Sequence, residues 1–411
     1  MGRAKEEYME RILRGFTEEE NVFVCEDHFQ DSSIISFIRK HGNKDEKCFF
    51  CSNIIFEEEE FTPTYSISTK VLLEGLIKCI NRSYDDPANG LAYESAEGGY
   101  IGGDTYTTLD LLNNVIPLEA DYKVIEYIAE NIYQDSWTEA DFYGTRHSEE
   151  LIIHWKSFSN LIKTKVRYMF NDVKPTSDFP NPLNILNVIG DCICKLSLFV
   201  NFPDETELFP KSNVIYRARQ HEDSNEVKLY KDICSPPNTK ATANRFSAEG
   251  ISMFYGAADE STAVEEVINR KKTDEYLTIS EFYPTRKLLL IDLRNIKRIG
   301  FFDFEKVDLY EPSQFLERFV DKVSEKLSPE DSRGIEFAPY QVVTEFFKHV
   351  LSSKLEKPID GIIYKSAQKK DSDCYVIFAE HDNCSDEENI KNETLLVLKK
   401  NSLRTRKVSS L

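Results

Sequence analysis

The chain has 411 residues, of which 41% are hydrophobic and 30% are charged, and its formal net charge is −20. That length exceeds one typical hydrophobic core, so we expect a globular protein of two or three domains. The strongly acidic balance disfavours sequence-independent nucleic-acid binding, because such a surface repels phosphate backbones.

The compartment is predicted from what the sequence lacks. No apolar run approaches the ~20 residues that cross a bilayer, so no membrane contact is expected. The segment 1–16 is charged throughout and has no apolar stretch of the signal-peptide kind. Nine unevenly spaced cysteines do not predict a disulfide framework, so we expect a cytoplasmic protein with reduced thiols.

Two short chelating pairs lie in the N-terminal region, residues 1–60. They are Cys25-Glu-Asp-His28 and Cys48-Phe-Phe-Cys51. Each pair can close a small ring around a metal, and three thiolates with one imidazole suit tetrahedral zinc. Four protein ligands leave no open position, so the predicted zinc site is structural. The alternative is a small apolar core that contains these residues by chance, and His41 would replace His28 if that ring points away.

A helical domain is expected over residues 61–204, after the acidic run 57–60. Apolar residues at helical spacing predict five helices, over Ser68–Arg82, Thr108–Val115, Glu119–Tyr133, Ser148–Phe170 and Asn184–Phe199. The glycine-rich stretch 98–103 predicts a flexible loop. Its glycines do not follow a strand and open a helix, so a phosphate-binding function for it is disfavoured.

The pattern changes after an acidic linker between Pro203 and Pro210, and a third domain is expected over 205–400, followed by a basic tail, 401–411. Short β-like runs are Val214–Arg217, Met253–Tyr255, Leu288–Asp292, Gly361–Tyr364 and Tyr375–Ala379. Helices are predicted between them, over Ser261–Arg270, Pro312–Leu327 and Gln341–Ser352. This mixture predicts an α+β fold with its own sheet.

Five short motifs follow one another in this third domain. They are Ile215-Tyr-Arg217-Ala-Arg219, Ala243-Asn-Arg245-Phe246, the strand that ends at Tyr255, Thr262-Ala-Val-Glu265-Glu266-Val267 and Asp360-Gly-Ile-Ile-Tyr364-Lys-Ser366. Their order and spacing resemble the RES domain, which is named for an arginine, a glutamate and a serine. With the cysteine pairs and the helix from Trp155 to Arg167, the chain resembles the subfamily whose RES domain follows a zinc-bearing, HEPN-related region.

The resemblance implies a site. Its arginines, aromatic residue, glutamate and serine correspond to Arg217, Arg245, Tyr255, Glu266 and Ser366. Asn244 replaces a glycine of the family pattern and Lys365 a frequent proline. The family fold is an ADP-ribosyltransferase-like mixed β-core with NAD⁺ in a cleft, so NAD⁺ is the expected substrate.

The residue types suit NAD⁺ chemistry. Arg217 and Arg245 can bind the pyrophosphate through charge-assisted hydrogen bonds. Cleavage of the nicotinamide–ribose bond builds positive charge on the ribose, which the Glu266 carboxylate can stabilise. Tyr255 can stack on nicotinamide, and Ser366 can hold the ribose or the amide. Glu265 lies roughly 100° around the helix from Glu266, so we expect it to be solvated.

The resemblance leaves several activities open. Inorganic phosphate as the nucleophile makes the protein an NAD⁺ phosphorylase, and water makes it an NAD⁺ glycohydrolase, in either case a toxin held by an antitoxin or regulatory protein. ADP-ribose transfer to a macromolecule and a non-catalytic binding or regulatory function are the alternatives. An RNase is disfavoured, because no histidine follows an arginine at the spacing typical of HEPN nucleases.

The remaining thiols, Cys374 among them, are expected to be ordinary buried or surface cysteines.

Overall fold

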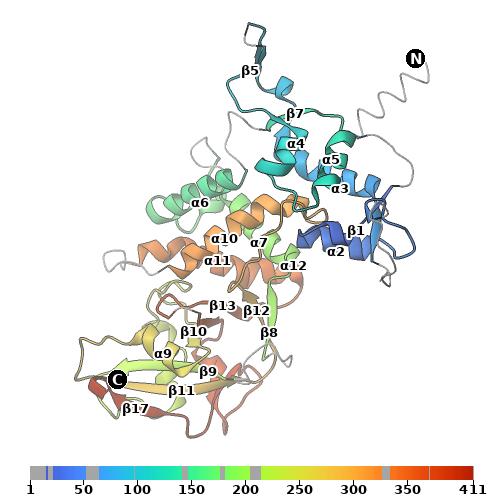
Figure 1. The fold of residues 1–411 in the computed structure, drawn as a ribbon. Coiled ribbons are helices and arrows are strands. Elements are labelled where there is room, and N and C mark those ends of the chain that lie inside the picture. Colours follow the sequence, from blue (N-terminus) through green and yellow to red (C-terminus); the bar gives the residue numbers. More distant parts are fainter. Residues whose placement is uncertain are drawn as a thin grey trace. The chain divides into compact units, whose positions relative to one another are not determined.

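The computed structural model describes residues 15–16, 22–51, 64–96, 98–140, 147–175, 181–203, 214–325, 334–369 and 371–410. The chain forms two compact units (Figure 1). Unit 1 contains Met1–Glu149 and Arg298–Glu311, and unit 2 contains Glu150–Lys297 and Pro312–Leu411. Among the described residues, no helix has the length and apolar character needed to cross a membrane.

Unit 1 combines short helices with small antiparallel sheets. Its helices are η1 (Glu26–His28), α2 (Ser32–His41), α3 (Thr69–Asn81), η3 (Pro87–Asn89), α4 (Thr108–Asp110), η4 (Leu111–Val115), α5 (Tyr122–Asn131) and η7 (Val307–Leu309). Its strands are β1 (Phe23–Cys25), β2 (Ser66–Ser68), β3 (Tyr84–Asp85), β4 (Ala92–Glu94), β5 (Gly99–Ile101), β6 (Tyr106–Thr107) and β7 (Ser136–Glu139). The sheets are β1–β2, β3–β7–β6 and β4–β5.

The core of unit 1 is built around α3. Leu72, Leu76 and Ile80 recur at helical spacing and are fully buried. The distant segment 298–311 adds Phe304 to the same core, where its ring lies so close to Gly75 that a Cβ there would come within 2.6 Å of it. A glycine at this position therefore lets the returning segment approach the helix.

The predicted helices of unit 1 are confirmed with changes at their ends. The segment 108–115 is helical, but its second half, η4, has π-helical geometry. The prediction of a loop at 98–103 is wrong in part, because Gly99–Ile101 forms strand β5 of a hairpin. Positive φ angles at Gly98 and Gly102 supply the bends on either side of that strand.

Unit 2 contains a large mixed sheet and the longer helices. Its helices are α6 (His147–Thr164), η5 (Phe170–Asp172), α7 (Pro182–Lys195), α8 (Tyr230–Ile233), η6 (Asn238–Lys240), α9 (Glu260–Val267), α10 (Tyr310–Ser324), η8 (Ile335–Phe337), α11 (Ala338–Glu345), η9 (Phe346–Leu351), α12 (Ser352–Leu355), η10 (His381–Asn383) and η11 (Val408–Ser410). Its strands are β8 (Phe199–Phe202), β9 (Ile215–His221), β10 (Phe254–Ala257), β11 (Tyr276–Pro284), β12 (Leu288–Asp292), β13 (Gly361–Lys365), β14 (Asp373–Ile377), β15 (Cys384–Asp386), β16 (Leu396–Leu398) and β17 (Arg404–Lys407).

The sheet order is β15–β16–β11–β9–β10–β14–β13–β12–β8, and β17 also pairs with β11. The β12–β13 and β15–β16 pairs are parallel, and the other pairs are antiparallel. Alternate side chains of β13 and β14 pack into two different hydrophobic clusters, one on each face of the sheet. Ile362 and Val376 pack with α6, α7, α10 and α11, whereas Ile363 and Tyr375 belong to a second cluster.

The α+β fold is confirmed, and each predicted strand is present in unit 2. The helix predicted over Asn184–Phe199 is wrong at its end, because α7 stops at Lys195 and Phe199 begins β8. Ser197 takes a left-handed φ of 52° and turns the chain between the two elements. Similarly, α6 ends at Thr164 rather than at Phe170.

Several strands of unit 2 were not predicted, among them β11, β15 and β16. Strand β11 has nine residues and pairs with three other strands. The expected basic tail instead contains strand β17, which pairs with β11 from Tyr276 to Ile279.

The predicted domain boundaries differ from the compact units. The prediction divides the chain at 204/205, whereas unit 2 begins at Glu150 and therefore includes nearly all of α6 and the whole of α7. The acidic linker that motivated this boundary, 204–210, lies outside the described residues, as does the acidic run 57–60.

Candidate functional site

A cavity of about 440 Å³ lies in unit 2 beside β9, β10 and α9. This volume falls within the roughly 300–1,000 Å³ of small-molecule sites. Four of the five residues predicted to act on NAD⁺ line the cavity, namely Arg217, Arg245, Tyr255 and Glu266. The fifth, Ser366, is not among the lining residues, but its hydroxyl forms a hydrogen bond with Glu266.

Arg217 lies on β9 and is held by two backbone carbonyls. Its Nε donates to the carbonyl of Ile233 at 2.5 Å, and its Nη1 donates to the carbonyl of Tyr255 at 2.6 Å. The guanidinium lies 5.0 Å from the ring centre of Phe254, and burial lowers the pKa of Arg217. Within the described part of the chain no carboxylate pairs with Arg217. A cation held in this way beside a cavity favours an anionic ligand.

Arg245 uses its guanidinium mostly within the protein. Nη1 donates to the carbonyls of Lys322 and Val323, and Nη2 donates to the carbonyl of Glu325 at 2.5 Å. These carbonyls belong to the C-terminal end of α10, where a cation also meets the negative end of the helix dipole. Arg245 therefore anchors α10 beside the cavity, and its contact with NAD⁺ stays a prediction.

Tyr255 and the loop around Arg245 are fixed by one hydrogen-bond network. The Tyr255 hydroxyl lies 2.9 Å from the Ser247 hydroxyl, and burial raises the pKa of Tyr255 to about 12. Gln341, on α11, donates through its side-chain amide to the carbonyls of Asn244 at 2.7 Å and Ser247 at 3.1 Å. Gln341 thus positions the loop, a role that its sequence position alone did not reveal.

Glu266 and Glu265 lie on α9 and have different surroundings. Asp259 caps the first turn of α9 by accepting a hydrogen bond from the Thr262 backbone at 3.0 Å. Glu265 forms an ion pair with Arg270 at 2.5 Å, and its side chain is 41% exposed. Glu266 lines the cavity instead. The two neighbouring glutamates therefore face in different directions, as helix geometry requires.

The Ser366 hydroxyl donates to Oε1 of Glu266 at 2.5 Å. It also accepts hydrogen bonds from the backbone N–H groups of Gln368 at 3.1 Å and Lys369 at 3.0 Å. A hydroxyl has one hydrogen to donate, and Glu266 receives it. The geometry thus favours Ser366 as a support for Glu266, whereas its predicted contact with ribose or amide is not tested.

The two departures from the family pattern fit the local structure. Lys365 ends β13 and forms an ion pair with Asp373 of β14 at 3.1 Å. The Asn244 side-chain amide donates to the carbonyl of Thr242 at 2.9 Å, and Asn244 lines the cavity. Lys240 also lines the cavity and adds a cationic side chain that belongs to none of the five motifs.

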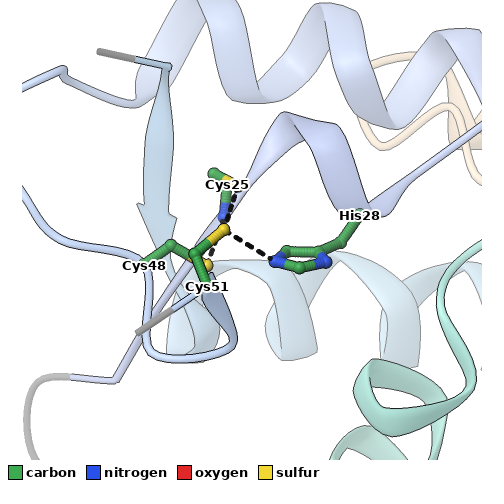
Figure 2. A group of neighbouring side chains, drawn as sticks. All are labelled: Cys25, His28, Cys48 and Cys51. Atoms are coloured by element: carbon green, nitrogen blue, oxygen red, sulfur yellow. Dashed lines mark hydrogen bonds between the residues drawn. The ribbon is translucent and has the colours of Figure 1, made fainter. Parts of the chain in front are cut away.

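The second cluster of chemical interest lies in unit 1. The ligand atoms of Cys25, His28, Cys48 and Cys51 lie within 4.8 Å of one another and converge on one point (Figure 2). The Cys25 and Cys51 sulfurs are 3.5 Å apart, and Nε2 of His28 is 3.2 Å from the Cys51 sulfur. Tetrahedral coordination with metal–sulfur bonds of about 2.3 Å places sulfurs about 3.8 Å apart, close to this spacing. The cluster could therefore hold a metal ion.

Asp121 orients the histidine of this cluster. Its carboxylate lies 2.6 Å from Nδ1 of His28. Because an ionised carboxylate can only accept, Nδ1 carries a hydrogen, and Nε2, which faces the Cys51 sulfur, is the nitrogen that would bind a metal. Asp121 is 93 residues from His28 in the chain, and no local sequence pattern connects the two.

The three thiols affect one another strongly. The hydrogen bond between Cys25 and Cys48 raises the pKa of the Cys25 thiol and lowers that of Cys48 to about 3. One sulfur is thus stabilised as a thiolate by its neighbours. A bound cation would stabilise all three thiolates and replace their protons.

Two family models match the chain. The model of the RES domain matches residues 214–398, and the model named HEPN/RES N-terminal domain 1 matches residues 41–176. The chain therefore belongs to the proteins in which this N-terminal domain precedes a RES domain. The RES family is associated with NAD⁺-related toxin activity. No curated protein and no solved structure matches the chain.

The matched ranges divide the chain differently from the packing. The match to HEPN/RES N-terminal domain 1 ends at residue 176 and so includes α6, whereas the contacts of α6 assign it almost entirely to unit 2. Cys25 and His28 precede the matched range, and Cys48 and Cys51 lie within it. The four residues that could hold a metal therefore come from inside and outside the matched range.

Proposed function

We propose that unit 2 cleaves the bond between nicotinamide and ribose in NAD⁺. One cavity brings together Arg217, a cation with no carboxylate partner among the described residues, and Glu266, a carboxylate held by Ser366. This observation carries the proposal. NAD⁺ presents the complementary charges, since its pyrophosphate is anionic and its ribose becomes cationic during cleavage.

Glu266 is the group that acts on the reacting carbon. When the bond between the nicotinamide nitrogen and the ribose C1′ breaks, both electrons go to nicotinamide and the ribose becomes an oxocarbenium ion. Oε1 of Glu266 accepts from Ser366, whereas Oε2 has no hydrogen-bond donor among the described residues. Oε2 is therefore available to stabilise the cationic ribose.

Arg217 and Tyr255 bind the rest of the substrate in this proposal. The remaining N–H groups of Arg217 donate to the pyrophosphate, and the Tyr255 ring stacks on nicotinamide. Arg245 connects its own loop to the C-terminal end of α10, and its guanidinium adds positive charge near the same phosphates. The nucleophile, either inorganic phosphate or water, then adds to C1′ and gives ADP-ribose 1-phosphate or ADP-ribose.

The decisive experiment incubates the purified protein with NAD⁺, with and without inorganic phosphate, and separates the products by chromatography. Phosphorolysis gives ADP-ribose 1-phosphate only with phosphate, and hydrolysis gives ADP-ribose in both mixtures. Label that moves from adenine-labelled NAD⁺ to a macromolecule would support the ADP-ribosyltransferase alternative. Binding of NAD⁺ without turnover would support the non-catalytic alternative.

In a cell, this activity makes the protein a toxin of a bacterial toxin–antitoxin or defence system. Depletion of NAD⁺ stops energy metabolism, so an antitoxin or regulatory protein must restrain the enzyme. Induced expression in a bacterial host is expected to lower cellular NAD⁺ before growth stops. Induced expression of the Glu266→Gln variant under the same conditions is expected to leave cellular NAD⁺ and growth unchanged. Arrest of growth with normal NAD⁺ would contradict the proposal.

Zinc is the metal that the cluster in unit 1 suits best. Thiolate and imidazole ligands favour zinc over magnesium or calcium, and four protein ligands define a closed, structural site. The ion would connect η1, which follows β1, to the segment around Cys48 and Cys51. Metal analysis of protein purified without chelators is expected to give one zinc per chain, and a metal-free protein of full stability would contradict this.

A further inference from the structure

Cys374 lies against the candidate catalytic carboxylate. It is on β14, it is 2% exposed, and it lines the cavity of unit 2. Its sulfur is 3.5 Å from Oε1 of Glu266, the same oxygen that accepts the Ser366 hydrogen. The sequence predicts an ordinary thiol at Cys374, because nothing in its neighbourhood along the chain connects it with α9.

The direction of this contact follows from the chemistry of the two groups. An ionised carboxylate has no hydrogen to give, so the thiol is the donor. The position of the thiol is fixed by the sheet, since Cys374 pairs with Ala257 on one side and with Tyr364 on the other. Two donors from separate elements, β14 and the loop after β13, therefore meet at one oxygen of Glu266.

We propose that Cys374 is a positioning residue for NAD⁺ cleavage, which holds Glu266 together with Ser366 so that Oε2 remains directed at the ribose. This inference rests on the proposed function. With a single donor, the carboxylate could rotate about the bond to its carboxyl carbon, and the two oxygens could exchange places. With two donors on Oε1, that rotation is hindered in the ground state and in the transition state.

The surroundings of Cys374 argue against a nucleophilic thiol. Burial raises its pKa well above the usual range for cysteine, and the nearby Glu266 charge raises it further. The nucleophile and metal ligand of cysteine is the thiolate, so a buried thiol beside this carboxylate is poorly reactive. A protonated thiol is also what the donor role requires.

The kinetic test compares Cys374→Ala, Cys374→Ser and Cys192→Ala. We expect Cys374→Ala to lower kcat about ten- to one-hundredfold, as for loss of a hydrogen bond to a charged group, with KM within about twofold. Cys374→Ser keeps a hydroxyl donor and should recover kcat to within about threefold of the unmodified protein. Cys192 is 1% exposed on α7 and is a matched control, because its replacement also removes a buried thiol.

Three kinetic results would overturn the inference. They are normal turnover of Cys374→Ala, a loss confined to KM, and equal losses in folded Cys374→Ala and Cys374→Ser. Circular dichroism melting checks that each variant is folded. If the unmodified protein itself does not cleave NAD⁺, the proposed function fails, and the contact with Glu266 is then judged by a second measurement.

That second measurement is the rate at which iodoacetamide alkylates Cys374, followed by peptide mass spectrometry. Burial is the main cause of the raised pKa of this thiol, and the Glu266 charge is the next. Glu266→Gln removes that charge, so we expect alkylation of Cys374 to become at least several-fold faster. Glu265→Gln, one position away, should leave the rate unchanged. Equal rates in all three proteins would contradict the contact between Cys374 and Glu266, whatever the enzymatic activity.

Discussion

The Ser366 hydroxyl donates a hydrogen bond to Oε1 of Glu266 and accepts hydrogen bonds from the backbone N–H groups of Gln368 and Lys369. All of the described hydrogen bonds of this hydroxyl are therefore made inside the protein. Glu266 lines the cavity, whereas Ser366 is not among its lining residues. This geometry favours support of the carboxylate over direct contact of Ser366 with the substrate.

The first prediction concerns Ser366→Ala. Loss of the hydroxyl removes a hydrogen bond to a charged group, so we expect kcat for NAD⁺ to fall about ten- to one-hundredfold. KM should change little, because Ser366 does not line the cavity. Steady-state kinetics checks this, with Ser372→Ala as the control from the same loop. A large rise in KM with normal kcat would show instead that Ser366 holds the ribose or the amide.

The second prediction concerns Arg217. If this guanidinium binds the pyrophosphate, Arg217→Lys should weaken NAD⁺ binding at least about tenfold, because the planar fork is lost while the charge remains. Arg219→Ala should bind normally, since Arg219 is exposed and forms an ion pair with Glu226. Isothermal titration calorimetry measures both. Unchanged affinity in folded Arg217→Lys would contradict the assignment.

The third prediction concerns the metal cluster. Asp121→Asn keeps a similar shape but loses the charge that orients His28, so we expect zinc affinity to fall about 10–100-fold. Competition with a chromophoric chelator measures the affinity. The control is Asp110→Asn, on α4, whose carboxylate accepts only from Asn114 among the described contacts. Equal affinities in the two variants would show that Asp121 does not tune the site.

Zinc bound at this site is expected to make the stability of unit 1 depend on pH. Metal binding requires thiolates, so protons compete with zinc as the pH falls. Zinc release and loss of folded unit 1 should therefore occur together on acidification, and a chelator should cause the same unfolding at neutral pH.

The grouping of Cys25, His28, Cys48 and Cys51 could be predicted from the sequence, because these residues form two local pairs. Asp121 could not be predicted, since only the folded chain brings α5 to η1. The same contrast holds at the cavity. Arg217 and Glu266 belong to recognisable motifs, whereas Cys374 and Gln341 act through partners about a hundred residues away.

Strand β11 was missed for a physical reason. Its residues are buried in succession from Leu277 to Ser280, so it lacks the alternation of a half-exposed strand. Two of these residues are polar and find partners only in the sheet. The Thr278 hydroxyl contacts His221 and Thr405, and the Ser280 hydroxyl donates to the carbonyl of Arg217.

The fourth prediction concerns the domain boundary. A fragment that begins at residue 205 lacks α6 and α7, which contribute Phe158, Ile162, Ile185 and Ile189 to the core of unit 2. Burying each such side chain contributes about 1.5–3 kcal/mol. We expect this fragment to be insoluble or unfolded, as judged by chemical denaturation and size exclusion. A folded fragment that binds NAD⁺ would instead support the boundary predicted from the sequence.

The central claim is that Glu266 stabilises the cationic ribose of NAD⁺, and its most direct test is the turnover of two neighbouring variants. Glu266→Gln keeps size and deletes the charge, so we expect kcat to fall by ~10²–10³ while NAD⁺ binding is retained. Glu265→Gln only releases the ion pair with Arg270 and should turn over NAD⁺ normally. Normal turnover by Glu266→Gln, or loss of turnover only in Glu265→Gln, would contradict the account.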